Sequence, residues 1–346
     1  MADVRVESLF PRVLGQEIIK RRLYHALKEN ALSHAYLLTG PAGLGKETMV
    51  REFAAAILCD QAETYCGVCT SCKQVNAGTH PELRWIIPDD PEKDTSLSVE
   101  LVRATIKEIY LKPYTGQWKV YGIPKANRLT PQAQNALLKT LEEPPDHAVI
   151  IMTAEQPQQL LPTVLSRCQR LDFRPVSMES IRDWLVREGK ASGDRSVTAA
   201  AYAHGVPSRA LQLLEDPVFQ EIRKQWLNTT ETCMTGDLSA FLESAEKLTQ
   251  EKASTLALLD FWQEWLRDLL VVKIAGEPEL LIHMDQIERL EEQGKRVELK
   301  SLTTGLRLLE DARNDLLNHG NPGYVTEVAL VNLMNQLLSL NGLRSV

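Results

Sequence analysis

The sequence predicts an α/β domain with a parallel sheet, followed by a second part that consists only of helices. Three observations lead to this fold class. Short apolar segments alternate with amphipathic helical patterns up to about residue 173, which is typical of a parallel sheet covered by helices on both faces. A glycine-rich loop that ends in a lysine follows the first of these segments. Beyond about residue 174 the strand pattern stops.

The strand candidates are short apolar runs, which suit strands that are buried on both faces. They are 34–39, 83–87, 119–123, 148–153 and 171–173. Apolar residues at helical spacing, from Val50 to Leu58, follow the glycine-rich loop, so we expect the loop to join a strand to a helix. A helical stretch is predicted at 158–165, directly before the last strand candidate.

Helical patterns fill the second half of the chain, and their clearest early break is Gly205-Val206-Pro207-Ser208. We therefore predict three parts: a sheet domain at 1–173, a small helical module at 174–214 and a packed helical domain at 215–346. Two apolar stripes at helical spacing in the last part are expected to be core. They are Leu258, Phe261, Trp262, Trp265 and Leu269, and Leu330, Leu333, Met334 and Leu337.

Composition and charge restrict the function classes. The 346 residues include 39 Lys and Arg against 46 Asp and Glu, which argues against a free-standing nucleic-acid binder that works by neutralising phosphates. No run approaches the ~20 apolar residues that span a bilayer. Residues 1–7 lack the apolar core of a signal peptide, so we expect a cytoplasmic protein.

The glycine-rich loop is a candidate phosphate-binding loop, with the sequence Gly40-Pro41-Ala42-Gly43-Leu44-Gly45-Lys46. In this pattern backbone N–H groups hold the phosphates and the lysine pairs with the terminal ones, which indicates ATP or ADP as the ligand. The hydroxyl that usually follows the lysine and ligates Mg²⁺ is replaced by Glu47. Thr48 lies one position late, about 100° round the helix. The alternative is that the loop is only an inherited structural turn.

The end of the strand candidate 119–123 lacks the acidic residues that ATP hydrolysis requires. Attack of water on a γ-phosphate needs an Asp that holds the metal and a residue that orients the water. Pro124 and Lys125 stand at this point, and neither can do either task. The nearest acidic pair, Glu142 and Glu143, ends a predicted helix and is expected to be solvated. The sequence therefore predicts an ATPase fold without hydrolysis of its own.

Four of the six cysteines have metal-ligand spacing: Cys59, Cys66, Cys69 and Cys72. Their tight spacing lets one turn of the chain surround a tetrahedral ion, and four thiolates are best matched by Zn²⁺. Because no coordination position is left open, the site is expected to be structural. The alternatives are a redox dithiol or unrelated core cysteines. Neither Cys-X-X-Cys pair is expected to begin a helix, as redox chemistry would prefer.

Ser166-Arg167-Cys168 stands between the helical stretch and the last strand candidate. Taken alone, Arg167 is typical of a surface salt bridge. An arginine at a subunit edge can also reach the γ-phosphate bound by a neighbour.

These motifs together resemble bacterial clamp-loader subunits of the AAA+ family, over roughly the first 210 residues. The resemblance rests on Gly15-Gln16, the phosphate loop, the four cysteines, Asn-Ala-Leu-Leu-Lys-Thr-Leu-Glu-Glu-Pro-Pro at 135–145 and Leu-Pro-Thr-Val-Leu-Ser-Arg-Cys at 161–168. In this family the intact ATPases are the gamma and tau subunits. The members with degenerate nucleotide motifs and a retained Ser-Arg-Cys are the delta prime subunits, and the chain resembles this second group.

The resemblance implies a subunit of a pentameric ring that helps to place a sliding clamp on primed DNA, with gamma or tau subunits and a delta subunit as partners. Arg167 would enter the ATP site of the neighbouring gamma or tau subunit. The four cysteines would hold the zinc ion of the family, and 215–346 would form the collar of the ring. Arg209 lies about one position from the lid arginine of active members, whose place Ser208 takes, and is left out of the site.

Two other interpretations stay open. A self-sufficient P-loop ATPase of the gamma/tau type would use Glu47 or Glu142 for the missing metal chemistry, and it would release phosphate as a purified chain. A zinc-dependent binding module that keeps the fold only as a scaffold would not join a ring of clamp-loader subunits.

Overall fold

The computed structural model describes residues 9–61, 65–88, 96–246, 248–249, 251–318 and 320–338. The expectation for residues 1–7 lies outside these ranges. The chain forms two compact units, one made of residues 1–181 and 205–208 and the other of residues 182–204 and 209–346.

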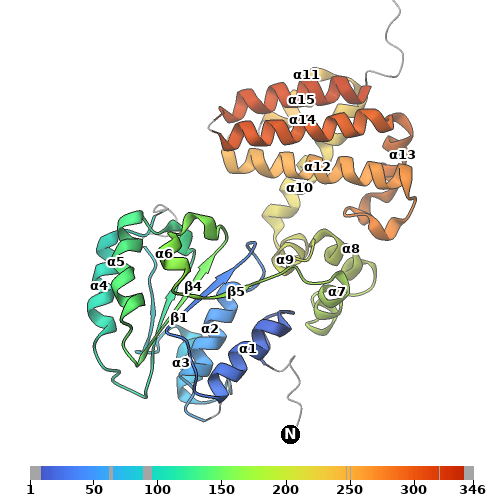
Figure 1. Ribbon diagram of the computed structural model, residues 1–346. Helices are drawn as coiled ribbons and strands as arrows, with labels where there is room; N and C mark the ends of the chain where they lie inside the picture. The colour runs from blue at the N-terminus through green and yellow to red at the C-terminus, as the bar shows by residue number, and fades with distance from the viewer. Residues whose placement is uncertain are drawn as a thin grey trace, which may run out of the picture. The chain divides into compact units, whose positions relative to one another are not determined.

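A five-stranded parallel sheet forms the centre of the first unit, in the order β2-β3-β4-β1-β5 (Figure 1). Each predicted strand segment overlaps one of these strands, so the predicted sheet is confirmed. The strands are β1 Ala35–Thr39, β2 Leu83–Trp85, β3 Lys119–Ile123, β4 Ala148–Ala154 and β5 Gln169–Asp172.

Helices cover both faces of the sheet (Figure 1). Helices α1, α2 and α3 pack over Tyr36 and Leu38, whereas α4, α5 and α6 pack over Ala35 and Leu37. Because successive strand residues point to opposite faces, β1 contributes to both cores. The helices are α1 Glu17–Lys28, α2 Lys46–Ile57, α3 Thr70–Ala77, α4 Val99–Ile109, α5 Pro131–Glu142 and α6 Pro162–Leu165, with short 3-10 turns η2 Ala126–Arg128 and η3 Pro157–Gln159.

The predicted helical stretch at 158–165 is interrupted, since only η3 and the short α6 form there. The side chain of buried Gln134 fixes the turn between them. Its Oε1 accepts a hydrogen bond from the N–H of Leu161 at 2.7 Å, and its Nε2 donates to the carbonyl oxygens of Leu129 and Gln159 at 3.0 and 3.4 Å. Pro162 then begins α6, where its missing N–H costs no helix hydrogen bond.

The remaining described elements are helical, as predicted for the chain beyond residue 174. Two helices lie in the predicted module at 174–214, a third runs one residue beyond it, and the others follow. They are α7 Met178–Arg187, α8 Asp194–Tyr202, α9 Pro207–Glu215, α10 Pro217–Thr235, α11 Leu238–Glu246, α12 Lys252–Ile274, α13 Ile287–Arg296, α14 Leu299–Leu317 and α15 Pro322–Leu338, with 3-10 turns η4 Pro278–Leu280 and η5 Met284–Gln286.

The core of the second unit lies among helices α10 to α15. Every residue of the two predicted apolar stripes is buried in it, so that prediction is confirmed. Trp265, which is fully buried, donates from Nε1 to Oε1 of Gln293 at 2.9 Å, so its one polar atom is satisfied. No helix in the described ranges is both long and apolar enough to span a bilayer.

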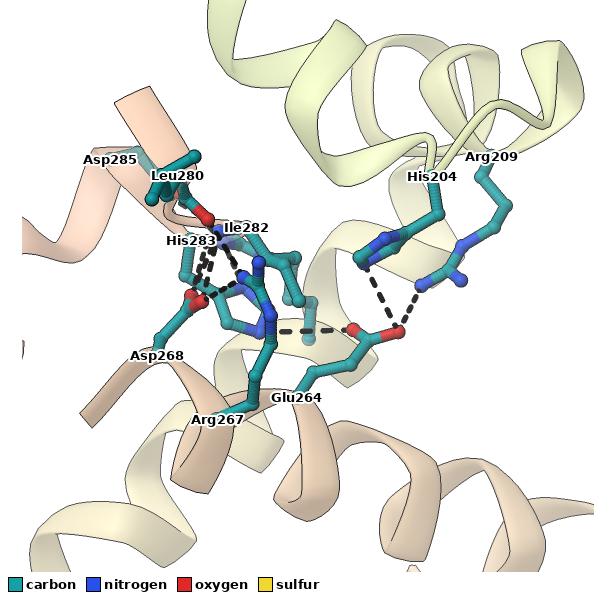
Figure 2. A network of polar contacts seen from close by, with 10 residues as sticks. His204, Arg209, Glu264, Arg267, Asp268, Leu280, Ile282, His283 and Asp285 are labelled. Carbon is teal, nitrogen blue, oxygen red and sulfur yellow. Dashed lines mark hydrogen bonds and ion pairs between the residues drawn. The ribbon is translucent and has the colours of Figure 1, made fainter. Parts of the chain in front are cut away.

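A partly buried polar network connects α12 with His204, Arg209 and residues 280–285 of the same unit (Figure 2). Glu264 pairs with Arg209 at 2.6 Å and lies 3.7 and 3.8 Å from the rings of His204 and His283. Burial lowers the pKa of His283 to about 3, and the positive charge of Arg223 acts in the same direction. His283 is therefore neutral at physiological pH.

Asp268 forms the second centre of this network (Figure 2). Its side chain is fully buried, and its carboxylate accepts hydrogen bonds from the N–H groups of Ile282 and His283 at 3.0 and 2.8 Å. Arg267 donates to the same carboxylate at 2.9 Å. The carboxylate thus satisfies backbone groups of the segment after η4 that burial would otherwise leave unpaired.

Candidate functional site

The phosphate-loop residues 40–46 join β1 to α2, as the sequence predicts. Gly40, Gly43 and Gly45 have φ angles of 132°, 80° and 86°, a backbone that residues with a side chain rarely adopt. Gly40 also lacks room, because a Cβ there would lie 2.6 Å from the carbonyl oxygen of Phe173. The loop therefore has the glycine backbone that a phosphate cradle requires.

Lys46 begins α2 and folds back onto the loop. Its Nζ donates to the carbonyl oxygens of Gly40 and Pro41 at 2.7 and 2.5 Å. Burial lowers the pKa of Lys46, and the negative charges of Glu155 and Glu47 oppose this shift. The ammonium group therefore lies against the backbone of the loop, at the carbonyl groups of Gly40 and Pro41. Glu47 is exposed and Thr48 is half-buried in the first turn of the same helix.

Sequence reasoning missed Glu155. Strand β4 runs parallel to β1 with Ala154 opposite Thr39, and the N–H of Gly40 donates to the carbonyl oxygen of Ala154 at 3.2 Å. The residue after Ala154 therefore follows its strand at the same edge as the phosphate loop. Its position two residues after the end of the strand candidate 148–153 was the signal in the sequence.

Strand β3 ends at Ile123, and Pro124 and Lys125 follow. Lys125 has a φ angle of 50°, and its N–H donates to Oγ1 of buried Thr153 at 2.9 Å. This turn is fixed to the end of β4, and it offers no carboxylate for a metal ion. The carboxylates whose charges act on Lys46 belong to Glu155 and Glu47 instead.

The segment 205–208 covers one glycine of the loop. The N–H of Ser208 donates to the carbonyl oxygen of Gly43 at 3.4 Å. A Cβ at Gly43 would lie 1.9 Å from Oγ of Ser208 and 2.8 Å from Cγ1 of Val206. The next residue, Arg209, belongs to the second unit, where its guanidinium pairs with Glu264 (Figure 2).

Arg167 follows α6 and is held by contacts within the first unit. Its Nη1 donates to the carbonyl oxygen of Thr163 at 2.9 Å and to Oγ of Ser166 at 3.4 Å. Its Nη2 lies 2.7 Å from Oε1 of Glu142, and the arginine side chain is still 34% exposed. Glu142 ends α5, as expected, but its carboxylate is paired with Arg167.

The four clustered cysteines come together in space, with all four Sγ atoms within 4.8 Å of one another. The Sγ atoms of Cys59 and Cys69 are 3.9 Å apart, and those of Cys66 and Cys72 are 3.8 Å apart. Four thiolates around zinc, with Zn–S bonds of about 2.3 Å, form a tetrahedron with edges of about 3.8 Å. The donor set and its spacing therefore fit a tetrahedral zinc ion.

One expectation about these cysteines is wrong. Cys69 is the N-cap of α3, so the pair Cys69 and Cys72 does begin a helix. The Sγ of Cys69 accepts the N–H of Cys72 at 3.3 Å, and the Sγ of Cys66 accepts the N–H of Cys69 at 3.4 Å. Hydrogen bonds from the N–H groups of Cys69 and Val68 lower the pKa of Cys66 to about 6. A helix start alone would suit a redox dithiol, and it is the convergence of four thiols that favours a metal ion.

Comparisons with known proteins agree with this geometry. A family model described as DNA polymerase III, delta subunit, matches residues 15–177. The delta' subunit of Bacillus subtilis DNA polymerase III is 29% identical over 325 residues, which cover 91% of this chain and 93% of that protein. The gamma subunit of Buchnera aphidicola from Schizaphis graminum is 31% identical over 262 residues, or 72% and 70% of the two chains. The chain belongs to the AAA+ family of DNA polymerase III clamp-loader subunits.

The tau subunit of Bacillus subtilis is a longer relative of this clamp-loader chain. It is 28% identical over 351 residues, which cover 94% of this chain and 61% of the tau subunit. The chain therefore spans about three fifths of that relative.

The clamp-loader family match begins at the Gly15-Gln16 pair and ends just after β5. Both residues have positive φ angles, and the amide of Gln16 pairs with the backbone of Arg174 through bonds of 2.7 and 3.1 Å. This contact ties the start of α1 to the chain after β5, so the two ends of the matched region meet. The region contains the phosphate loop, the four cysteines and Arg167.

Proposed function

We propose that this chain is a non-hydrolysing subunit of the delta prime type in a bacterial clamp loader. The observation that carries the proposal is the end of β3, where Pro124 and Lys125 stand and no carboxylate is offered to a metal ion. The delta' subunit of Bacillus subtilis, of which the chain covers 93%, supports the same assignment.

In this proposal Arg167 acts on a neighbouring gamma or tau subunit. An arginine supplied in trans stabilises charge on the transferred phosphoryl group and is typically worth ~10³ to 10⁵ in rate. The contacts of Arg167 with Thr163, Ser166 and Glu142 support this role, because they hold a partly exposed guanidinium in place. The delta subunit, the sliding clamp and primed DNA are further partners, which a cytoplasmic complex would bring together.

The proposal includes two ligands. ATP or ADP would bind, without hydrolysis, at Gly40, Gly43, Gly45, Lys46, Glu47 and Thr48, which the glycine backbone and the position of Lys46 support. Structural Zn²⁺ would bind at Cys59, Cys66, Cys69 and Cys72, which the spacing of the sulfur atoms supports. We also propose that 174–214 acts as the lid and 215–346 as the collar of the subunit.

Two measurements on the full chain test the proposal. Phosphate release from Mg-ATP by the purified chain should stay at background, and Lys46→Ala should not change it. Brisk turnover that Lys46→Ala abolishes would overturn the non-hydrolytic part. On a sizing column the chain should form a defined complex with gamma or tau and delta subunits, and separate elution would argue against a clamp-loader role.

A gamma-type ATPase is a second candidate. The gamma subunit of Buchnera aphidicola is 31% identical, and the charges of Glu155 and Glu47 act on Lys46. Carboxylate oxygens are the ligands that Mg²⁺ prefers, so these residues are the ones such an enzyme would use. Turnover by the purified chain that is lost in both Lys46→Ala and Glu155→Gln would favour this candidate.

A further inference from the structure

Helix α5 carries contacts at both ends of the arginine element, which we define as residues 161–168. Gln134 binds the N–H of Leu161, where the element begins. Glu142, the last residue of α5, binds the guanidinium of Arg167 near the end of the element. The same helix therefore determines where the arginine element starts and where its cation lies.

The contacts of Arg167 leave part of its hydrogen-bonding capacity available. A guanidinium has five N–H donors, two on each Nη and one on Nε. Thr163 and Ser166 accept from Nη1, and Glu142 pairs with Nη2. Within the described residues, one N–H of Nη2 and the N–H of Nε are not engaged by these partners. Arg167 can thus stay anchored to its own subunit while it donates to an acceptor outside it.

The ion pair has little value for stability alone. The side chains of Arg167 and Glu142 are 34% and 49% exposed, and exposed ion pairs contribute little to the free energy of unfolding. Their effect on geometry is larger, because a free arginine side chain has many rotamers and loses that freedom when it is fixed. The ion pair fixes part of the arginine side chain in advance, so less conformational entropy is lost when Arg167 contacts a neighbouring subunit.

We propose that Glu142 is the positioning residue of Arg167. It holds the guanidinium in one orientation, with the remaining N–H groups ready for phosphoryl oxygens bound by the neighbouring subunit. The inference rests on the proposed function of Arg167 in trans. Glu142 does not touch the substrate and acts only through the arginine.

The test measures single-turnover phosphate release by the assembled complex of the full chain with gamma or tau and delta subunits. Glu142→Ala should lower the single-turnover rate constant at the completed site on the order of tenfold, with the ATP concentration that gives half the maximal rate unchanged, because a guanidinium held only through Nη1 must be fixed further in each turnover. Glu142→Gln should keep most of the rate, since its amide oxygen can accept the same hydrogen bond. Glu142→Asp, with its carboxylate withdrawn by one methylene, should be several-fold slower, and it replaces the Ala variant if that variant does not assemble.

Glu143→Ala is the matched control. It removes the same charge from the adjacent position, and in the described part of the chain Glu143 forms no ion pair with Arg167. Its rate should equal that of the wild type. The double variant Arg167→Ala with Glu142→Ala should be as slow as Arg167→Ala alone, because Glu142 has no route to the reaction except the arginine.

The outcomes separate this inference from the proposed function. If Arg167→Ala slows the complex but Glu142→Ala does not, or if Glu142→Ala speeds it up, the positioning role is overturned and the role of Arg167 stands. If the double variant is much slower than Arg167→Ala, Glu142 acts by another route and the inference is overturned. If Arg167→Ala leaves the rate unchanged, the proposed function fails and the positioning role fails with it.

Discussion

The two units of the molecule use their polar groups in different ways. In the first unit, four thiols converge on one point and Arg167 presents unused N–H groups at the surface. In the second unit, buried Asp268 is enclosed by the N–H groups of Ile282 and His283 and by Arg267 (Figure 2). Groups of the first kind have binding capacity for something outside the chain, whereas groups of the second kind are satisfied within it.

This difference tells which substitutions should change binding or rate and which should change folding alone. Removing a group that has unused binding capacity should abolish the binding of a ligand or slow the reaction of a partner subunit. Removing a group that is satisfied internally leaves buried partners unpaired, so it should lower the free energy of unfolding.

The metal ligands should give the largest effect. Structural zinc sites contribute on the order of 10 to 16 kcal/mol of binding free energy, which couples to folding. The wild-type chain should carry about one zinc per chain, and Cys69→Ser should lose it and unfold at a lower temperature. Cys168→Ser, outside the cluster, should keep the metal. Metal analysis and thermal unfolding measure both, and a Cys69→Ser variant with full zinc content would contradict the site.

Asp268→Ala should give a large loss of stability in the second unit. The substitution leaves two buried N–H groups without their acceptor, at a cost of about 1 to 3 kcal/mol each, and removes one acceptor of the partly exposed Arg267 guanidinium. Arg167→Ala, at an exposed ion pair, should cost less than about 1 kcal/mol. Urea unfolding of the two variants compares the units directly. Equal losses of stability in the two variants would contradict the difference between the units.

Gly43→Ala tests the contact between the phosphate loop and Ser208. A methyl group there meets Oγ of Ser208, whereas the same change at Gly78, also at positive φ, meets nothing within 4 Å. Both variants carry backbone strain. Only Gly43→Ala should also lose about 1 to 3 kcal/mol of the free energy of unfolding through overpacking. The free energies of unfolding measure this difference. If the two variants lose the same stability, Ser208 does not pack on the loop.

The pH dependence of stability tests the enclosure of His283. Its pKa is about 3 in the folded chain, below the usual value for histidine of about 6.5. At a pH between these two pKa values, His283 binds a proton in the unfolded chain but not in the folded chain. The free energy of unfolding therefore falls as the pH falls, by about 1.4 kcal/mol per pH unit.

His283→Gln should remove this contribution, so its stability should fall less steeply than that of the wild type between pH 6.5 and 4.5. Urea unfolding at several pH values gives the slopes. A His283→Gln slope equal to that of the wild type would show that His283 titrates normally and is not enclosed.

Much of the fold could be predicted because it depends on buried apolar runs. Strand β3 has the predicted bounds, because its residues are buried on both faces and therefore form a short continuous apolar run in the sequence. Trp262 and Trp265 were assigned to the core from helical spacing alone, and both are fully buried. The interruption before α6 was missed because the fixing hydrogen bonds come from Gln134, a residue on another helix.

The candidate site was predictable only where its residues are close in sequence. The loop and the cysteine spacing are local patterns, and the structure brings their members together. The pairing of Glu142 with Arg167 and the effect of Glu155 on Lys46 join separate elements, so no spacing rule contains them. The N-cap role of Cys69 was missed because sulfur is not among the usual capping groups.

We propose that the chain does not hydrolyse ATP itself and completes the site of a neighbour with Arg167. Single-turnover phosphate release tests it most directly, measured for the chain alone and for its complex with gamma or tau and delta subunits, with and without Arg167→Ala. The account predicts background release by the chain alone, rapid release by the complex and a loss of ~10³-fold at the completed site in the variant. Brisk release by the chain alone, or an Arg167→Ala complex as fast as the wild type, would contradict it.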